Sequence, residues 1–442
     1  MPKDLARTLT RNDLVLLLTG TVIGSGIFLV PGGVLQQTGG HVGLALTVWF
    51  LGGVLSLLGA LTYGELGAMN PAAGGIYVYI RDAFGRLPAF LYGWTLFFVI
   101  SSGSLATLAV AFSRYLDQLI DLTPLVARLV SILVIVVIAF INVVGTRKSA
   151  NVQNLTTAVK VAAIVAMSVA LIVLGDPIRA FGGQPWPEIG ATALLSGMGA
   201  AMIGVLWAYE GWQYATFAAG ETVEPERNFP RAMFIGTAAL IAIYLLPNIA
   251  YIAALGPEGV MRSDRVASEA VTALLGSAAG NLIAVAILVS IFSAANGLTL
   301  TAPRVYFAMA RDGVFFRRLA DVHPRFGTPA FAIIVSSAWA ILLAATGTFE
   351  QLLTYVVFAG WIFYALGAAS IFVYRRTRPG ASRPFTVPFY PVTPLLFIVA
   401  AAAIVINTFI VQPGRASVGL AGVLIGVPAY LVWSSKSADA GR

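Results

Sequence analysis

Long apolar segments recur along the whole chain and are separated by short polar stretches. Each segment is long enough to cross a lipid bilayer as a helix. There are twelve, at residues 14–38, 43–69, 87–113, 125–145, 153–174, 191–219, 231–255, 279–310, 329–346, 351–374, 393–411 and 416–433. The pattern predicts an all-α polytopic membrane protein. Amphipathic stretches at 70–85 and 263–276 predict two further short helices, the first on the cytoplasmic face and the second on the external face.

Two of the twelve segments are interrupted near their centres. The first contains "GTVIGSGIF" (20–28), and the sixth contains "LWAYEGWQ" (206–213), in which Glu210 precedes Gly211. Close packing against small residues would explain the first stretch alone. Irregular backbone at this depth is tolerated where it lines a cavity, and the two segments lie five apart, so their five-helix units would have opposite orientations. The matched interruptions therefore favour an inverted-repeat transporter with a central site.

A broken helix exposes backbone groups of both signs. A break at Gly24, Ser25 and Gly26 leaves free N–H groups, which suit a carboxylate, and free carbonyls, which suit an ammonium group. The carbonyls expected to accept from that ammonium group are those of Val22, Ile23, Trp207 and Tyr209. Because an α-amino acid presents both charges close together, the interruptions predict an amino acid site. Its expected lining is Val22, Ile23, Gly24, Ser25, Gly26, Trp207, Ala208, Tyr209 and Glu210.

Composition narrows the possible functions. The chain is 58% hydrophobic and 10% charged, and its mean hydropathy is +0.87. It has no cysteine and two histidines, so disulfides and the usual zinc, haem and iron–sulfur ligand sets are missing. No phosphate-loop motif occurs. We therefore expect neither an enzyme nor a cofactor, and transport driven by a gradient or by exchange. A channel is the alternative from another class, but few polar residues align along the segments.

The basic residues indicate the orientation. With a cytoplasmic N-terminus, 20 of the 27 Lys and Arg residues fall on the inside, six on the outside, and Lys160 within a span. This asymmetry follows the positive-inside rule. It explains the net positive charge of the chain without a nucleic-acid partner. The N-terminal segment has no small-residue cleavage site and is expected to be retained. The predicted units are two tails (1–13 and 434–442), two five-helix repeats (14–174 and 191–374) and two additional helices (393–433).

Five ordered motifs carry a resemblance to a known family. They are "GTVIGSGIF", "YGELGAMNPAAGGIYVYI", "LWAYEGWQ", "ETVEPERNFPRA" and "FSAANGLTLTAPRVYFAMARDG". Together they resemble the amino acid–polyamine–organocation (APC) superfamily, and within it prokaryotic relatives of the L-type amino acid transporter light chains. The resemblance implies a LeuT-like fold of 5+5 inverted repeats with discontinuous helices 1 and 6. It also implies that Ser25 and Gly26 bind the substrate carboxylate, that carbonyls of Val22, Trp207 and position 210 bind the ammonium, and that Trp207 closes over the side chain.

The chain departs from that family in two ways. Animal light chains use a cysteine to join a heavy subunit, and this chain has none, so a disulfide-linked heavy chain is excluded. Glu210 stands where many carriers of neutral amino acids have glycine. Three readings remain open for it: selection of a cationic side chain, proton exchange, or hydrogen bonding to exposed backbone.

Four further polar residues are candidates for coupling or gating. An ammonium in the middle of a span, such as Lys160, needs a compensating partner. The resemblance places it where sodium-driven relatives hold an ion, with Ser293 as its expected hydrogen-bond partner, so that it ties the first half-helix to span eight. Snorkelling to the surface is the alternative. Glu65 is expected to pair with basic loop residues, and Asn296 to line the cavity.

The function predicted from the sequence is secondary active transport of L-amino acids across the bacterial inner membrane by alternating access. Small neutral substrates and an exchange or proton-linked mechanism are expected, with amino acid, lipid and possibly protons as the partners of the chain. The alternative is a carrier of cationic amino acids or polyamines, which Glu210 motivates.

Overall fold

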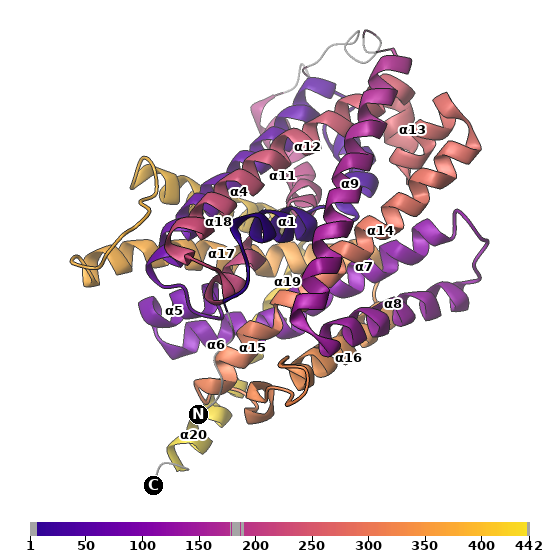
Figure 1. The fold of residues 1–442 in the computed structure, drawn as a ribbon. Coiled ribbons are helices and arrows are strands. Elements are labelled where there is room, and N and C mark those ends of the chain that lie inside the picture. Colours follow the sequence, from indigo (N-terminus) through magenta and orange to yellow (C-terminus); the bar gives the residue numbers. More distant parts are fainter. Residues whose placement is uncertain (1–6, 177, 179–185, 187–189, 440–442) are drawn as a thin grey trace.

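Helices form almost all of the chain in the computed structural model, which describes residues 7–176, 178, 186 and 190–439 (Figure 1). The first half contains α1 (Arg11–Val22), α2 (Gly26–Leu29), α3 (Pro31–Gln37), α4 (Val42–Met69), α5 (Ile76–Phe84), α6 (Arg86–Thr95), the π-helix η1 (Leu96–Ile100), α7 (Ser101–Leu116), α8 (Pro124–Val144) and α9 (Thr146–Leu174). The expected loop helix at 70–85 is confirmed as α5.

The second half is also helical. It contains α11 (Ala191–Ala208), the 3₁₀-helix η2 (Trp212–Glu221), α12 (Pro225–Arg262), α13 (Val266–Leu275), α14 (Ser277–Thr301), α15 (Pro303–Arg311), η3 (Arg317–Ala320), α16 (Ala330–Thr346), α17 (Phe349–Thr377), α18 (Val392–Val411), α19 (Pro413–Leu424) and α20 (Gly426–Asp439). Helix α13 confirms the second expected loop helix.

Ten helical stretches of the described chain are long and apolar enough to cross a membrane. Several combine two elements, such as α1 with α2 and α14 with α15. The two remaining predicted segments correspond to the 18-residue α11 and the 17-residue α16. The predicted eighth span, 279–310, is divided in the structure because Pro303 begins a separate helix.

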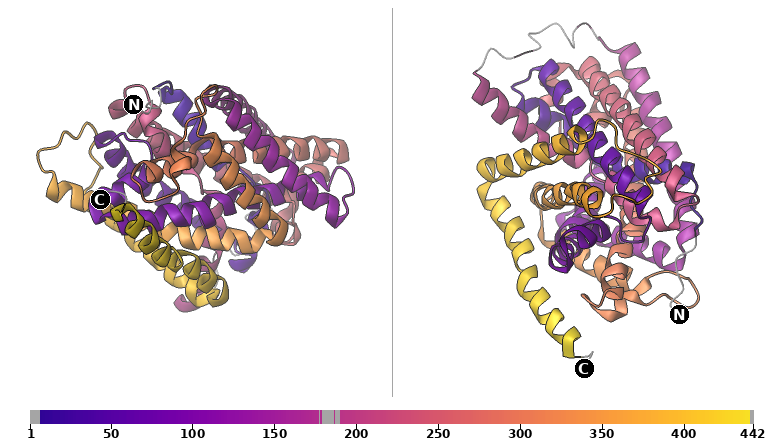
Figure 2. Two further views of the ribbon diagram at one scale, coloured as in Figure 1. Left: turned by 90° about the horizontal axis from the view of Figure 1, so that it is seen from below. Right: turned by 90° about the vertical axis from the view of Figure 1, so that its left-hand side faces the viewer.

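The two interrupted segments lie at the centre of the bundle. Helix α1 packs against α9, α12, α14 and η2, and α7 lies on the other side of α14 (Figure 1). The last three helices, α18 to α20, run along one side of the molecule (Figure 2). The central helices are therefore shielded by other helices, and the polar groups that they carry must find partners inside the bundle.

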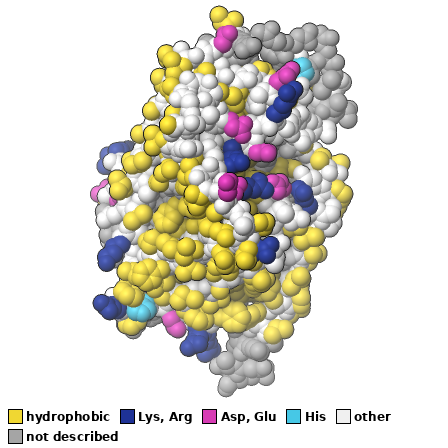
Figure 3. Space-filling model, turned by 90° about the vertical axis from the view of Figure 1, so that its right-hand side faces the viewer, with side chains coloured by type: hydrophobic (Ala, Val, Ile, Leu, Met, Phe, Trp, Pro, Cys, Tyr) yellow, Lys and Arg dark blue, Asp and Glu magenta, His cyan; other side chains and the backbone are white. Residues whose placement is uncertain are grey.

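Apolar side chains face outward on the peripheral helices. Figure 3 shows a broad hydrophobic surface on one face, with charged side chains gathered mainly above it and at its lower edge. On α8 and α9 the exposed apolar residues include Leu129, Leu133, Phe140, Leu155 and Val173. An exposed apolar surface of this extent is typical of a protein surrounded by lipid.

Candidate functional site

The first interrupted segment contains a true break. Helix α1 ends at Val22, residues 23–25 are not helical, and α2 begins at Gly26. In the described chain, the amides of Ser25, Gly26 and Ile27 donate no hydrogen bond to another backbone group. These three N–H groups are therefore available to an anionic ligand.

The second interrupted segment breaks at the predicted acid. Helix α11 ends at Ala208, and η2 begins at Trp212. Between them, Gly211 has a φ of +131°, a backbone conformation that residues other than glycine rarely adopt. Helix α11 therefore does not continue through Glu210, and the chain resumes as a tighter 3₁₀ turn.

The two breaks are in direct contact. A Cβ atom added to Gly26 would lie 2.5 Å from the Cα of Ala208, and one added to Gly211 would lie 3.0 Å from the backbone of Thr21 and Val22. Neither glycine leaves room for a side chain. The glycines that weaken each helix therefore also allow the two interrupted segments to approach each other closely.

A small cavity of about 20 Å³ lies where the breaks meet. Six of the predicted residues line it, namely Val22, Gly24, Ser25, Gly26, Trp207 and Glu210. Four further lining residues, Thr21, Ser104, Leu108 and Leu298, were not predicted. Since this volume is about that of one water molecule, the cavity must widen before it can admit an amino acid.

Three predicted residues lie outside this lining. Ile23 is fully buried, and Ala208 contacts Gly26. The ring of Tyr209 packs against those of Trp49 and Tyr244, at centroid distances of 6.3 and 4.8 Å. Tyr209 belongs to the second break, but its ring packs in this aromatic cluster and is not part of the cavity lining, where the sequence had placed it.

The Ser25 hydroxyl in the cavity wall has no hydrogen-bond partner within the described structure, and its side chain is almost completely buried. The Ser104 hydroxyl is buried in the same wall and lies close to the hydroxyl of Tyr214. A buried hydroxyl without a partner costs free energy comparable to a lost hydrogen bond. The cavity wall therefore offers a hydrogen-bonding group to a polar ligand.

The carbonyl groups at the breaks are used differently from the prediction. Ile23 O accepts hydrogen bonds from Lys160 Nζ at 2.6 Å and from the Ser290 hydroxyl at 3.2 Å. Both of its lone pairs are occupied, so the expected role of Ile23 O in binding an ammonium ligand is wrong. The Tyr244 hydroxyl lies 3.0 Å from Val22 O and 2.7 Å from Ala208 O, and it bridges the ends of α1 and α11.

Lys160 connects three helices. It lies in the middle of α9, only 2% of it is exposed, and its Nζ donates to Gly20 O and Ile23 O of α1, both at 2.6 Å. A longer contact of 3.4 Å reaches Ser290 O of α14. Ser293 was expected to be its partner, but the Ser293 hydroxyl accepts from Thr156 at 2.9 Å. The contact to span eight is therefore present through a different residue, Ser290.

Glu210 and Trp207 both line the cavity at the second break. Glu210 Oε1 accepts hydrogen bonds from the Tyr364 hydroxyl at 2.6 Å and from the side-chain amide of Gln213. The Trp207 ring meets that of Phe349 edge-on at 6.2 Å. Glu210 is thus held by α17 and η2, and Trp207 forms part of the cavity wall.

The two other predicted polar residues lie elsewhere. Asn296 belongs to a buried network with Asn142, Ser149 and Gln153 that joins α14 to α8 and α9. The Glu65 carboxylate forms two hydrogen bonds with Arg375, at 2.9 and 2.7 Å. Pairing of Glu65 with a basic residue is thus as expected, whereas Asn296 does not line the cavity.

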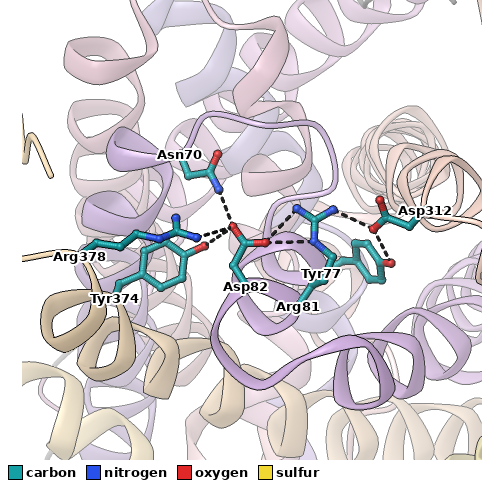
Figure 4. A network of polar contacts seen from close by, with 7 residues as sticks. All are labelled: Asn70, Tyr77, Arg81, Asp82, Asp312, Tyr374 and Arg378. Carbon is teal, nitrogen blue, oxygen red and sulfur yellow. Dashed lines mark hydrogen bonds and ion pairs between the residues drawn. The ribbon is translucent and has the colours of Figure 1, made fainter.

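A second polar cluster surrounds α5 (Figure 4). Arg81 donates to Asp312, which follows α15, at 2.7 Å, and to its neighbour Asp82. Asp82 in turn accepts from Tyr374 and Arg378 at the end of α17. Partial burial alone would lower the pKa of Arg81, but its hydrogen bonds to Asp312 and Asp82 raise that pKa above the ordinary value, so the guanidinium stays charged.

This cluster borders a cavity of about 560 Å³. Its walls include Arg81, Asp312, the loop at 71–73 and Gly220 at the end of η2. A Cβ atom added to Gly220 would lie 3.0 Å from Ala73 N. The loop before α5 is therefore packed directly on the second interrupted segment.

Comparison with known proteins places this geometry in context. Residues 9–429 match the family model described as amino acid permease. The serine/threonine exchanger SteT of Bacillus subtilis is 33% identical over 426 residues, which cover 96% of each chain. The large neutral amino acids transporter small subunit 2 of Rattus norvegicus is 33% identical over 95% of this chain and 80% of its own. The human cystine/glutamate transporter is 32% identical over 98% of this chain and 87% of its own.

Proposed function

Because the chain belongs to the amino acid permease family, we propose that it exchanges small neutral L-amino acids by alternating access across the inner membrane of a bacterium. Both chain ends would be cytoplasmic, and the helices would form twelve spans in a 5+5 inverted repeat followed by two more. The contact between the two broken segments, five spans apart, supports this arrangement. The distribution of Lys and Arg supports the orientation.

The observation that carries this proposal is a small cavity with polar and apolar lining at the meeting point of two broken helices. The substrate carboxylate would accept from the free amides of Ser25 and Gly26 and from the Ser25 hydroxyl. The ammonium group would donate to Val22 O, which has one lone pair beyond its contact with Tyr244. Trp207 would close over the side chain.

The cavity wall favours a small, uncharged side chain. Leu108 and Leu298 supply apolar surface, and among the described lining residues there is no lysine or arginine to pair with an acidic side chain. Glu210 would repel an acidic side chain as well. SteT is a serine/threonine exchanger, which supports small uncharged substrates, and the transporter of large neutral amino acids supports uncharged ones.

Lys160 would take the place of a bound cation in this mechanism. Its ammonium group holds Gly20 O and Ile23 O at the end of α1, next to the amides that would bind the carboxylate. In the proton-linked form of the proposal, Lys160 gains and loses a proton during transport. Its contact with the end of α1 would then depend on the pH.

Counterflow in proteoliposomes tests the function. Vesicles loaded with unlabelled alanine should accumulate external radiolabelled alanine faster than empty vesicles do, and the rate should saturate. Linear, non-saturating flux would refute a carrier. Arginine and putrescine, tested in the same vesicles, examine the alternative that Glu210 motivates: strong exchange of arginine with weak exchange of alanine would replace the neutral assignment by a cationic one.

A further inference from the structure

The cavity beside α5 has more basic than acidic side chains in its wall. Its volume is about 560 Å³, and it lies between the loop before α5, the end of η2 and the helix α15. Three arginines line it, namely Arg7, Arg81 and Arg311, and Asp312 is the one acidic residue among the described lining residues. Because guanidinium groups around one cavity repel one another, the wall favours a negatively charged ligand.

The N-terminal segment brings Arg7 to this cavity. The amides of Thr8 and Leu9 both donate to Glu221 O, at 2.8 and 2.9 Å. The amide of Val223 donates to Leu9 O at 2.8 Å. The backbone that follows Arg7 is therefore fixed to the end of η2. Arg7 itself is exposed, and its side chain forms no ion pair or hydrogen bond within the described structure.

The acidic groups closest to Arg7 in this part of the fold already have basic partners. Asp312 accepts from Arg81 at 2.7 Å (Figure 4). At the end of η2, the Glu221 carboxylate accepts from Arg304 at 2.8 Å, and both of these side chains are buried. Neither carboxylate therefore neutralises Arg7, and the wall of the cavity keeps an excess of positive charge.

We propose that this cavity binds a phosphate-bearing anion, which is either the head group of an anionic phospholipid or free phosphate. Arg7 and Arg311 donate to its oxygens, since a planar guanidinium pairs with phosphate through two parallel hydrogen bonds. The bound anion joins the N-terminal segment and η2 to α15, and it holds this end of the bundle, cytoplasmic in the proposed orientation, closed. The effect on transport rests on the proposed function, whereas the binding itself does not.

Thermal unfolding in detergent tests the binding without transport. Inorganic phosphate is added in increasing concentration, with sodium chloride of equal ionic strength as the reference. Short-chain phosphatidylglycerol is compared in the same way with short-chain phosphatidylcholine. A ligand of the folded state raises the unfolding temperature by mass action, and we expect a saturable rise of about 2–5 °C. A rise with phosphate identifies a site for the free anion, and a rise with phosphatidylglycerol alone identifies a site for the lipid head group.

Two substitutions in the wall and one outside it show where the ligand binds. Arg7→Gln and Arg311→Gln each remove one charge from the cavity and should reduce the rise by at least half. Arg128→Gln is the matched control, because Arg128 is an exposed arginine of α8 outside the cavity, and this variant should respond as the parent does. No saturable rise with either ligand, or the same rise in the two cavity variants as in the parent, would overturn the inference.

Alanine counterflow tests the effect of the anion on transport. A ligand that binds one state better shifts the population toward that state, so the ligand that raises the unfolding temperature should lower the counterflow rate by roughly twofold or more when it is present on the cytoplasmic side. The same loss is expected in Arg128→Gln, and little or none in Arg7→Gln. An unchanged rate with the ligand bound would overturn the closing role of the anion. Absence of alanine counterflow in the parent without any ligand would instead refute the proposed function and leave the binding result standing.

Discussion

Lys160 carries a positive charge at a depth where lipid and protein provide little solvation. A charged side chain in the middle of a span costs at least ~2.5–3.5 kcal/mol, so its environment must offset that cost. The offset comes from backbone: two carbonyls of α1 accept from Nζ at 2.6 Å each. Gly20 lies in the last turn of α1, and Ile23 is the first residue of the break. The charge therefore stabilises carbonyl groups that would accept from amides of the same helix if α1 were continuous.

Replacing Lys160 should weaken both the fold and the coupling. In Lys160→Ala, Gly20 O loses its donor, and Ile23 O keeps only Ser290. We expect a loss of about 1–3 kcal/mol in stability, seen as a lower thermal unfolding temperature in detergent. If protons are transported through Lys160, any dependence of alanine uptake on the pH gradient should also disappear.

The exposed Lys148 near the start of the same helix provides the control, and Lys148→Ala should leave both properties unchanged. A Lys160→Ala variant that transports with the same pH dependence as the parent would refute proton coupling at this residue. The stability prediction would be wrong if the two variants unfolded at the same temperature.

At the residue scale, the sequence predicted most groups whose chemistry is visible in the side chain. Ser25, Glu210 and Lys160 stand out because polar residues are rare in apolar segments. The partner of Lys160 was not predictable, because the choice between Ser290 and Ser293 depends on small rotations of α14 and because its main partners are backbone carbonyls. Ser104 was missed for a related reason. It is one of three serines within four residues, and no pattern in the sequence indicates that Ser104, and not Ser101 or Ser102, lines the cavity.

Gly211 shows how a single backbone conformation joins two elements. It has a φ of +131°, and it faces the backbone of Thr21 and Val22, so it allows η2 to meet α1. Gly211→Ala would strain the backbone at this φ. Its methyl group would also meet backbone atoms of Thr21 and Val22, which cannot move aside as a flexible side chain could. We expect it to destabilise the protein by about 1–3 kcal/mol and to reduce counterflow at least tenfold.

Gly33→Ala is a suitable comparison, since Gly33 lies in α3 with open space around it. That substitution should be neutral or slightly stabilising in a helix. Unfolding temperature and alanine counterflow, measured for both variants, check the expectation. Equal behaviour of the two variants would show that contact between the broken segments is not required.

At the element scale, apolar length and turn residues predicted most helices correctly. The loop helices α5 and α13 and the breaks in the first and sixth segments were predicted from the local order of apolar, polar and glycine residues. The boundary between α14 and α15 was missed because the apolar run continues through Pro303. Hydrophobicity records that a segment is in lipid, whereas the division of a segment into two helices depends on local backbone geometry.

At the scale of the whole molecule, charged contacts join parts of the chain that are far apart in sequence. Helix α5 is linked through Arg81 to Asp312 and through Asp82 to Tyr374 and Arg378 (Figure 4). The loop before α5 packs on η2, which continues from the second break. In the proposed orientation this cluster lies at the cytoplasmic end. A change at the site would therefore be transmitted to α5 through η2, and the ion pairs would set how readily that end opens.

Exchanging the charges of one ion pair tests this link. Arg81→Asp places a third carboxylate beside Asp82 and Asp312, and it should change the KM measured from the cytoplasmic side by at least threefold, with a smaller effect from the external side. The double variant Arg81→Asp, Asp312→Arg restores an opposite pair and should reverse at least half of the change in the KM measured from the cytoplasmic side.

The exposed pair Arg262 and Glu258 is the control. Exchanging its charges in the same way should leave the KM on both sides unchanged, since such surface pairs contribute little. Because the chain has no native cysteine, the sidedness can be verified with a single introduced cysteine and an impermeant reagent. Equal changes in KM on both sides, or no recovery in the double variant, would show that the cluster supports folding alone and does not control access from the cytoplasm.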